Sequence, residues 1–472
     1  MAIIFNISEA IKDSSFNVLG LQIPMLLENQ VEEFQKGSKI SDVFVNKTLD
    51  GYSTSYHTTV SHGGFRPSED MEIAKLHDWE DSYGKTFIAQ TWKDSFAISE
   101  EAREDNRSLE IAGKVRDFST NYARTREQYC AATVSGALTA SFKYGGKKFP
   151  LSAIDSTNAE IDGPKQLYFH RYHYTSVKVV DKDDFIEMNG REPWTNAGSS
   201  DTTAPGNTAP AGIYATPPQS NKFLVYGGKL DKDGHPMDKG LNLLKVNPDT
   251  GDTADNMAVY DQIRFVLDAI REYGMNHRDY DGRLVPLNYS KIVMPSNSMF
   301  NKSLRAALGA SLTEGPLEGP LQGDKFSITE WAYLNDLPGF KKKELGMLIT
   351  DPTRNSTELG FILWDRKPLT VTSYLQDGNN TMVWYGRARF RTDTCDPYAC
   401  VYVAFGDLAN LTAQAYSGTE STKYTKGSAA TKTITDSNAT FIDLSTFEMT
   451  NNPTVYTGIT SGTGESGGSD GG

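Results

Sequence analysis

A long helical repeat constrains the fold of this chain more than any other feature. Within residues 96–138, apolar and small side chains recur in alternating steps of four and three, which places them on one stripe of an α-helix. The members of this stripe are Ile111, Val115, Phe118, Tyr122, Thr125, Tyr129 and Ala132. A second face consists of small residues that allow another backbone to approach closely: Ala112, Ser119, Ala123 and Cys130. The charged residues fall on the remaining surface, namely Lys114, Arg116, Asp117, Arg124, Arg126 and Glu127.

Polar and acidic residues precede this helical repeat. The segment 96–98 has the composition of a strand end, and Ser99 after it suits an N-cap position. Acidic side chains then favour the positive end of a helix dipole, and they are Glu100, Glu101, Glu104 and Asp105. We therefore expect a strand that leads directly into a long core helix capped by Ser99. Taken alone, this stretch fits any α+β protein equally well.

The middle of the chain has α/β character. Residues 257–273 predict a second helix whose apolar stripe includes Tyr260, Ile263, Leu267 and Ile270, and Gly274 stands where such a helix stops. The apolar run at 291–294 predicts a buried strand, and residues 297–308 predict another helix. Helix, strand and helix in this order are typical of mixed α/β packing.

Two strand patterns follow, at 369–375 and 382–391, joined by an Asp-Gly-Asn-Asn turn at 377–380. Side chains alternate across a strand, so Arg387, Arg389 and Arg391 share one face. Such a row suggests contact with phosphate or carboxylate groups, although a solvated or interface-paired face is the commoner case. Residues 398–405 predict a third strand.

Length and composition limit the function classes. With 472 residues, 38% hydrophobic and 11% aromatic, the chain can bury one large core or several smaller ones. A net charge of −13 argues against a dedicated nucleic-acid-gripping protein, but not against a container that encloses nucleic acid. The N-terminal residues lack a basic region followed by an apolar run, so we expect no signal peptide, and no apolar run is long enough for a membrane span.

The search for catalytic or ligand-binding motifs yields no assignment, so no catalytic, cofactor-binding or metal-binding residue is predicted. His170 and His173 could be metal ligands, but a strand aims them to opposite faces and no cysteine or carboxylate cluster accompanies them. The cysteines, Cys130, Cys395 and Cys400, are too few for a disulfide framework, and inert buried thiols are the favoured interpretation. The close-set aspartates near 231–255 lack EF-hand spacing and suit turns and caps. We predict that the chain is not an enzyme and needs no cofactor.

Several segments have little core of their own. Residues 1–47 resemble an arm with a short amphipathic helix that includes Leu26, Leu27 and Phe34. Residues 48–95 are rich in Ser, Thr, Gly and Tyr and end in a strand at 85–96, which predicts a long hairpin or loop; an ordinary surface hairpin is the alternative. From about residue 408 onward Ser, Thr, Gly and Asn dominate, as in a flexible tail with short runs suited to strands that add to a partner.

Taken in order, these features resemble the major capsid proteins of tailed bacteriophages with the Hong Kong 97-type fold, and among them the Mu-type major head subunits. The resemblance rests on the strand end and acidic start of the long helix, the Asp162-Gly163 segment with Leu167 and Tyr168, and the Asp351-Pro352 pair. It covers roughly residues 48–406 and lies in the order of loose motifs. Tyr168 stands where the family has phenylalanine, which leaves the register of that segment open.

The resemblance implies an α+β fold with an N-terminal arm, an extended loop, a peripheral domain built on a long spine helix, and an axial domain. The expected divisions are arm 1–47, extended loop 48–97, peripheral domain 98–255 with a loop-rich insertion at about 180–255, axial domain 256–362, peripheral strands 363–407, and a C-terminal extension 408–472. Some members of this fold cross-link through a lysine of the extended loop. Lys85 lies in that region, but no motif identifies it or a partner.

The resemblance further implies a structural protein of the virion that self-assembles into hexamers and pentamers. These would form an icosahedral shell around double-stranded DNA, without sequence-specific binding. Scaffolding, portal and decoration proteins are the implied partners, with assembly in the host cytoplasm and no membrane association. Two alternatives remain: an encapsulin-like compartment shell that holds protein cargo, and a soluble α/β enzyme or binding protein with an unrecognised site.

Overall fold

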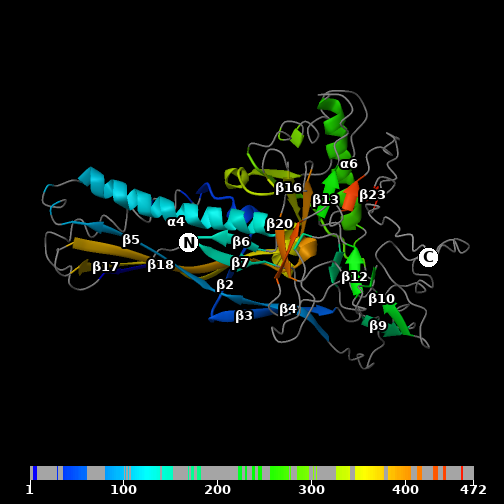
Figure 1. Cartoon of the computed structure of the whole chain (residues 1–472), viewed down its shortest axis with the longest axis horizontal. Helices are drawn as coiled ribbons and strands as arrows, with labels where there is room; N and C mark the ends of the chain where they lie inside the picture. Colours follow the sequence, from blue (N-terminus) through cyan, green and yellow to red (C-terminus); the bar gives the residue numbers. More distant parts are fainter. Residues whose placement is uncertain are drawn as a thin grey trace, which may run out of the picture. The chain divides into compact units, whose positions relative to one another are not determined.

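The computed structural model divides the chain into two compact units (Figure 1). Unit 1 comprises residues 1–54, 86–133 and 361–393, and unit 2 comprises residues 55–85, 134–360 and 394–472. The chain therefore passes between the units several times. The structure describes residues 4–7, 29, 34, 36–60, 80–99, 101, 105, 108–138, 141–151, 168–169, 172–174, 178–181, 222–225, 229–230, 236–239, 243–246, 256–275, 277, 284–296, 301, 304–305, 326–340, 346–376, 381–404, 412–416, 429–433, 440–442 and 459–460.

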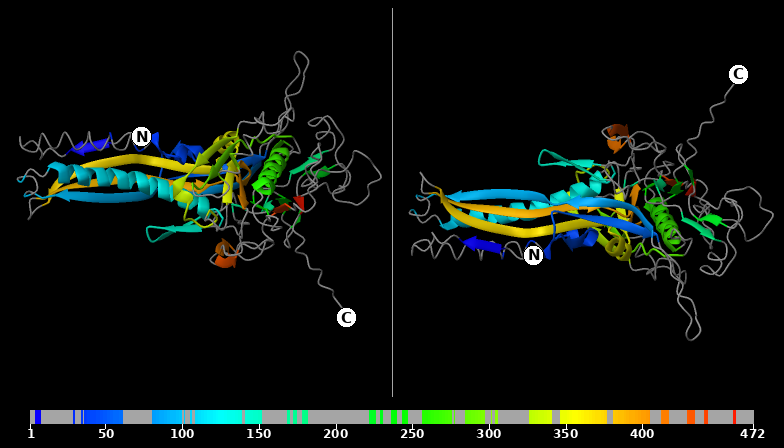
Figure 2. Two further views of the ribbon diagram at one scale, coloured as in Figure 1. Left: turned by 90° about the horizontal axis from the view of Figure 1, so that it is seen from above. Right: turned by 90° about the horizontal axis from the view of Figure 1, so that it is seen from below.

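Unit 1 is a five-stranded sheet covered on one face by the long helix α4. The sheet has the order β1-β17-β18-β5, with β2 also paired to β17. Its strands are β1 (Ile4–Ile7), β2 (Val45–Thr48), β5 (Gln90–Ile98), β17 (Phe361–Gln376) and β18 (Thr381–Thr394). The first two pair with β17 in parallel, whereas β5 and β18 are antiparallel over nine residue pairs. Figures 1 and 2 show α4 running along these strands.

The predicted long helix is present as α4 (Ser108–Gly136), which at about 1.5 Å per residue is roughly 43 Å long. Its expected N-cap is wrong. The helix begins nine residues after Ser99, and Asp105 lies in a turn whose backbone N–H donates to the Glu101 carbonyl. The acidic residues belong to this separate turn, so the strand β5 does not lead directly into the helix.

The helix packs through the stripe that its periodicity predicts. Val115, Phe118 and Tyr129 are buried against the sheet. Phe118 approaches Phe96 of β5 with ring centroids 5.1 Å apart. The ring of Tyr129 lies 4.9 Å from that of Trp92, also on β5. Gly386 of β18 lies under Phe118, and a Cβ at that position would overlap the phenylalanine ring.

Two charged residues of α4 are buried, contrary to the expectation that all its charges face outward. Arg126 is 6% exposed and donates two hydrogen bonds to Asp365 of β17, at 2.8 and 3.0 Å. Glu127 is 3% exposed and accepts hydrogen bonds from the Ser38 hydroxyl and the Lys39 backbone N–H. Partners distant in sequence satisfy both charges, which the helical pattern alone does not reveal.

Unit 2 is built on a seven-stranded sheet with the order β15-β14-β16-β19-β13-β22-β23. Its strands are β13 (Leu243–Val246), β14 (Lys291–Met294), β15 (Ser327–Glu330), β16 (Gly346–Thr350), β19 (Cys400–Ala404), β22 (Thr440–Ile442) and β23 (Ile459–Thr460). The predicted buried strand at 291–294 is confirmed as β14. The strand expected at 398–405 forms as β19, and it pairs with β16 and β13 of this sheet rather than with the long hairpin.

The second predicted helix is confirmed as α6 (Asn256–Met275). Its buried residues Ile263, Val266 and Leu267 belong to one core cluster with side chains of β14, β16 and β19. Gly274 is not the expected stop, because the helix runs one residue further. Its role is close approach: the Leu287 backbone N–H donates to the Gly274 carbonyl at 2.8 Å, and a Cβ on Gly274 would collide with the Leu287 carbonyl.

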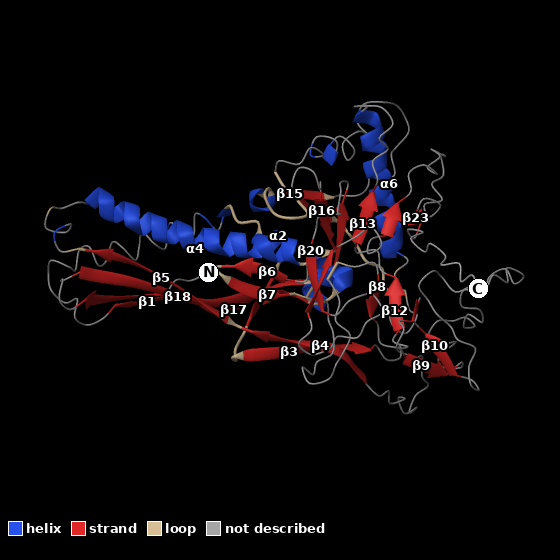
Figure 3. Cartoon of the chain, in the orientation of Figure 1, coloured by secondary structure: helices blue, strands red, loops and turns tan. Residues whose placement is uncertain are grey.

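Shorter elements complete the described chain (Figure 3). The segment expected to form an extended loop contains the paired strands β3 (Ser53–Val60) and β4 (Glu80–Ile88). The remaining helices are α2 (Ile40–Val43), α8 (Pro352–Glu358), η3 (Ala332–Leu334) and η4 (Pro397–Ala399). The remaining strands are β6 (Ser141–Tyr144), β7 (Lys147–Pro150), β8 (Tyr172–Tyr174), β9 (Lys178–Asp181), β10 (Lys222–Val225), β11 (Lys229–Leu230), β12 (Pro236–Lys239), β20 (Thr412–Tyr416) and β21 (Ala429–Thr433).

Strands also occur where a flexible C-terminal tail was expected. Strand β22 pairs in parallel with β13 of the same chain, and β20 pairs with β21. The helix expected at 297–308 is helical at residues 301, 304 and 305, and its other residues lie outside the described part. Among the described helices, none combines the length and the apolar character that crossing a membrane requires.

Candidate functional site

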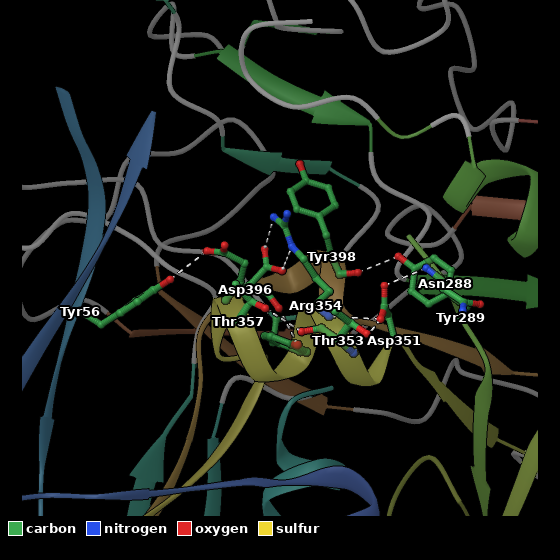
Figure 4. Close-up of polar contacts among 11 residues, drawn as sticks. Tyr56, Asn288, Tyr289, Asp351, Thr353, Arg354, Thr357, Asp396 and Tyr398 are labelled. Atoms are coloured by element: carbon green, nitrogen blue, oxygen red, sulfur yellow. Dashed lines mark hydrogen bonds and ion pairs between the residues drawn. The ribbon is translucent and has the colours of Figure 1, made fainter. Parts of the chain in front are cut away.

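A network of buried polar groups surrounds the short helix α8 in unit 2 (Figure 4). Asp351 is the N-cap: its Oδ1 accepts the backbone N–H groups of Thr353 and Arg354 at 2.9 and 3.1 Å. Pro352 at the first helical position needs no hydrogen-bond acceptor and already has a helical φ. The second oxygen, Oδ2, accepts the backbone N–H of Asn288 at 2.8 Å. One 3% exposed carboxylate thus joins the helix to the loop before β14.

The helix also carries an ion pair with the segment before β19. The Nε of Arg354 donates to Oδ2 of Asp396 at 2.8 Å. Asp396 is 4% exposed, and its backbone carbonyl accepts the hydroxyl of the buried Tyr168 at 2.7 Å. Similarly, the Tyr289 hydroxyl donates to the Tyr398 carbonyl at 2.7 Å. These bonds hold residues 396–398 between α8 and the loop before β14.

His277 is a buried member of this region that sequence analysis did not identify. Its ring lies 4.9 Å from that of Tyr398 and 6.0 Å from that of Tyr273. Burial, with the nearby positive charge of Arg354, lowers the pKa of His277 to about 3. The imidazole is therefore neutral at ordinary pH and packs as an aromatic ring.

Hydrogen bonds within unit 2 also hold the points where the chain enters or leaves it. The Tyr56 hydroxyl, just inside one such point, donates to Glu358 of α8 at 2.9 Å. The Lys85 ammonium donates to the Thr394 carbonyl at 2.7 Å. The backbone N–H of Cys395 donates to the Gly360 carbonyl at 3.0 Å. Four chain passages are thereby tied to α8 or to its neighbouring backbone.

The turn that ends α8 requires special backbone geometry. Leu359 adopts a left-handed conformation with φ of 61°. At the next residue, Gly360, a Cβ would overlap the Ala399 side chain and the Asn355 amide oxygen. The close contact explains the glycine, and it allows the chain to leave unit 2 directly after the helix.

The chemistry of this network is that of positioning. Backbone N–H groups and an arginine already occupy the oxygens of Asp351 and Asp396. The three cysteines are free and buried, and burial raises the pKa of Cys130 and Cys400, so both thiols are protonated at neutral pH. The free state of Cys395 and Cys400 agrees with the favoured interpretation of inert thiols.

The arginines singled out from the sequence lie on unit 1. Arg387 of β18 is exposed, whereas Arg389 and Arg391 are half-buried. Arg391 forms an ion pair with the buried Asp393 at 3.1 Å. The predicted common face is confirmed by the opposite set of β18 residues: Gly386 lies under Phe118 of α4, and the ring of Phe390 lies 6.0 Å from that of Tyr129.

The two histidines considered as metal ligands are not described at side-chain level. His170 lies outside the described residues, and His173 is in β8, where it pairs with Asp238 of β12. In the described part of the chain, no group of three or more His, Cys, Asp or Glu residues has the geometry to hold a metal ion. Asp162, Gly163 and Leu167 also lie outside that part, whereas Tyr168 is fully buried.

The sequence contains a signal for α8 that went unused. Asp followed by Pro is the usual combination of N-cap and first helical residue, and it occurs at Asp351-Pro352 and again at Asp396-Pro397. This signal predicts both helix starts. It does not reveal that Arg354 from the first helix reaches Asp396 at the start of the second.

Comparisons with known proteins return structural neighbours only. The sequence matches no family model and no curated protein. Among solved structures, the chain is similar to the capsid of the native GTA particle, with a TM-score of 0.34 and 12% identity over 78% of this chain and 90% of the other. It is similar to the mature capsid of bacteriophage PhiM1, with a TM-score of 0.36 and 11% identity over 76% and 84% of the two chains. A virus-like particle from Pyrococcus furiosus gives a TM-score of 0.34 and 8% identity over 81% and 98%.

Proposed function

We propose that this protein is a shell-forming major capsid protein of the tailed-bacteriophage type. Many copies assemble as hexamers and pentamers into an icosahedral shell that encloses double-stranded DNA without reading its sequence. The chain acts through interfaces between copies, and scaffolding, portal and decoration proteins are its expected partners. The particle forms in the host cytoplasm.

The composition of unit 1 is the observation that carries this proposal. Its sheet combines an N-terminal strand, the second strand of a long segment with little core, and a hairpin of 16- and 14-residue strands, and a 29-residue helix covers one face. The order of these elements along the chain is the order that the resemblance to Hong Kong 97-type capsid proteins implies. A stiff body of this kind, built from distant segments, suits a protein that carries load between neighbours.

The α8 network supports the same proposal. It holds the chain passages in unit 2 through charged and aromatic side chains whose hydrogen-bonding groups are already occupied. Such a site fixes geometry and leaves no free nucleophile or carboxylate for substrate chemistry. Unit 2 corresponds largely to the segment for which the resemblance implies an axial domain, around the centre of a capsomer.

Electron microscopy of the purified protein, together with light scattering, tests the proposal. Closed shells, tubes or rings of five or six are expected, alone or after co-expression with a scaffolding protein. A stable monomer or dimer that no scaffold or salt condition drives to assemble would overturn it. Shells isolated from the native host should contain DNA, whereas shells filled with protein would favour the encapsulin-like alternative.

A further inference from the structure

The face of the unit 1 sheet turned away from α4 is strongly basic. Side chains alternate across a strand, so the neighbours of residues that contact α4 point to the opposite face. On β18, Gly386 lies beneath α4, and on β17 Asp365 bonds to Arg126 of α4. We call the opposite set the basic face, and its members are Lys93, Arg366, Arg387, Arg389 and Arg391.

Most of these cations have no acidic partner in the described structure. Asp393 is the one acidic residue of the described sheet strands with the same orientation, and it pairs with Arg391. Lys93 and Arg387 are directly opposite each other on β5 and β18, and both are exposed. Like charges in such a cross-strand pair repel each other. In addition, the Nε of Arg389 is buried without a hydrogen-bond partner in the described structure.

A bound anion would relieve this repulsion, and the chain itself contains a matching one. Residues 68–81 link to and enter β4, and they read SEDMEIAKLHDWED, with six acidic residues and one lysine. In an extended segment, alternate side chains such as Asp70 and Glu72 are about 6.7 Å apart, the same spacing as alternate arginines along β18. Arginine binds carboxylates in a planar, two-toothed geometry that suits such a match.

We propose that the basic face of one copy binds the acidic segment 68–81 of another copy. The inference rests on the proposed assembly function and names the chemistry of one of its contacts. The donor and acceptor surfaces differ, so the contact is head-to-tail and can close into rings. Double-stranded DNA is the disfavoured occupant because the whole chain carries a charge of −13 and repels a polyanion.

Charge reversal tests this contact. The basic-face variant is Lys93→Glu/Arg387→Glu, which keeps a like-charged cross-strand pair and so preserves the repulsion within the sheet. The acidic-segment variant is Asp70→Lys/Glu72→Lys. The matched control is Arg116→Glu/Arg124→Glu, because both residues are exposed on α4 and the change in net charge equals that of the basic-face variant.

Each of the two interface variants should need about tenfold more protein than the wild type to assemble, because two exposed ion pairs become repulsive contacts. A mixture of the two variants should assemble like the wild type, since every contact between unlike copies is again complementary. The control should assemble normally. Wild-type behaviour of both interface variants, or an equal loss in the control, would overturn the proposal. So would rescue within one chain carrying all four changes but not in the mixture, because the contact would then lie within one copy.

A peptide experiment separates failure of this proposal from failure of the assembly function. A labelled peptide of residues 66–82 should bind the wild-type protein and the α4 control equally, and the basic-face variant about tenfold more weakly. This result holds even if no shells form under any condition. Equal binding to all three proteins would overturn the proposal, as would a 20-base-pair DNA duplex that depends on Lys93 and Arg387 while the peptide does not.

Discussion

Buried charges on α4 show how single residues connect distant parts of unit 1. Burial lowers the pKa of the Arg126 guanidinium, but its hydrogen bonds to Asp365 outweigh that effect, and the pKa is raised overall. The same guanidinium lies 4.8 Å from the centre of the Phe390 ring on β18. The side chain therefore touches both long strands, and its charge depends on one carboxylate.

Removing that carboxylate should be strongly destabilising. In Asp365→Ala, Arg126 stays buried without its partner, and we expect the free energy of unfolding of unit 1 to fall by about 3 kcal/mol. Urea unfolding of the unassembled protein measures this change. The paired variant Arg126→Met/Asp365→Leu should recover most of the loss because it removes both charges. A double variant as unstable as Asp365→Ala would contradict this account of the pair.

His277 should make unit 2 sensitive to acid. Its folded pKa of about 3 lies below the ordinary value of 6.5, so between these values the unfolded chain binds one more proton than the folded chain. The stabilisation is thus complete above pH 6.5 and is lost as the pH falls, at about 1.4 kcal/mol per pH unit. Unfolding measured at pH 7.5 and pH 5.0 should differ by about 2 kcal/mol more in the wild type than in His277→Phe. An identical pH dependence of the two proteins would be inconsistent with a buried neutral histidine.

At the scale of elements, the packing of α4 on β18 depends on a close approach that glycine permits. Gly386 faces Phe118 and the Leu369 side chain, with no room for a Cβ. Gly113, within α4 itself, has open space around the position of a Cβ. The two glycines therefore predict opposite effects of adding a side chain.

We expect Gly386→Val to destabilise unit 1 by about 2 kcal/mol or more, because the helix must move away from the sheet. Gly113→Ala, in contrast, should stabilise it by up to about 1 kcal/mol through helix propensity. Thermal unfolding followed by circular dichroism at 222 nm compares the two variants directly. If Gly386→Val is as stable as the wild type, α4 does not pack on β18 in this register.

For the whole molecule, the division into two units has a consequence for local stability. Unit 1 has its own helix and sheet, and the core cluster of α6, β14, β16 and β19 lies entirely within unit 2. Each core buries its own apolar residues, so a local defect should loosen one unit before the other.

Hydrogen exchange detected by mass spectrometry measures this difference. Gly386→Val should reduce protection in α4, β17 and β18, while β14, β16 and β19 keep wild-type protection. Lowering the pH to 5.0 should have the opposite distribution because His277 lies in unit 2. Equal loss of protection in both units under either change would show that they unfold as one.

The sequence by itself determined the elements whose local pattern is strong. Periodicity specified α4 and α6 and their buried stripes, and alternation specified the long strands and the shared face of the three arginines. These features depend on neighbours a few residues apart, which a sequence displays directly. Even the start of α8 was readable from Asp351-Pro352.

Tertiary structure alone decided which distant groups meet. The pairing of Arg126 with Asp365 and of Arg354 with Asp396, and the membership of β19 in the unit 2 sheet, depend on chain paths that no local pattern records. The same is true of His277, whose neighbours come from separate segments. Burial of a charge is stable only where the fold brings a partner to it, so its position reflects the whole chain rather than the helix that carries it.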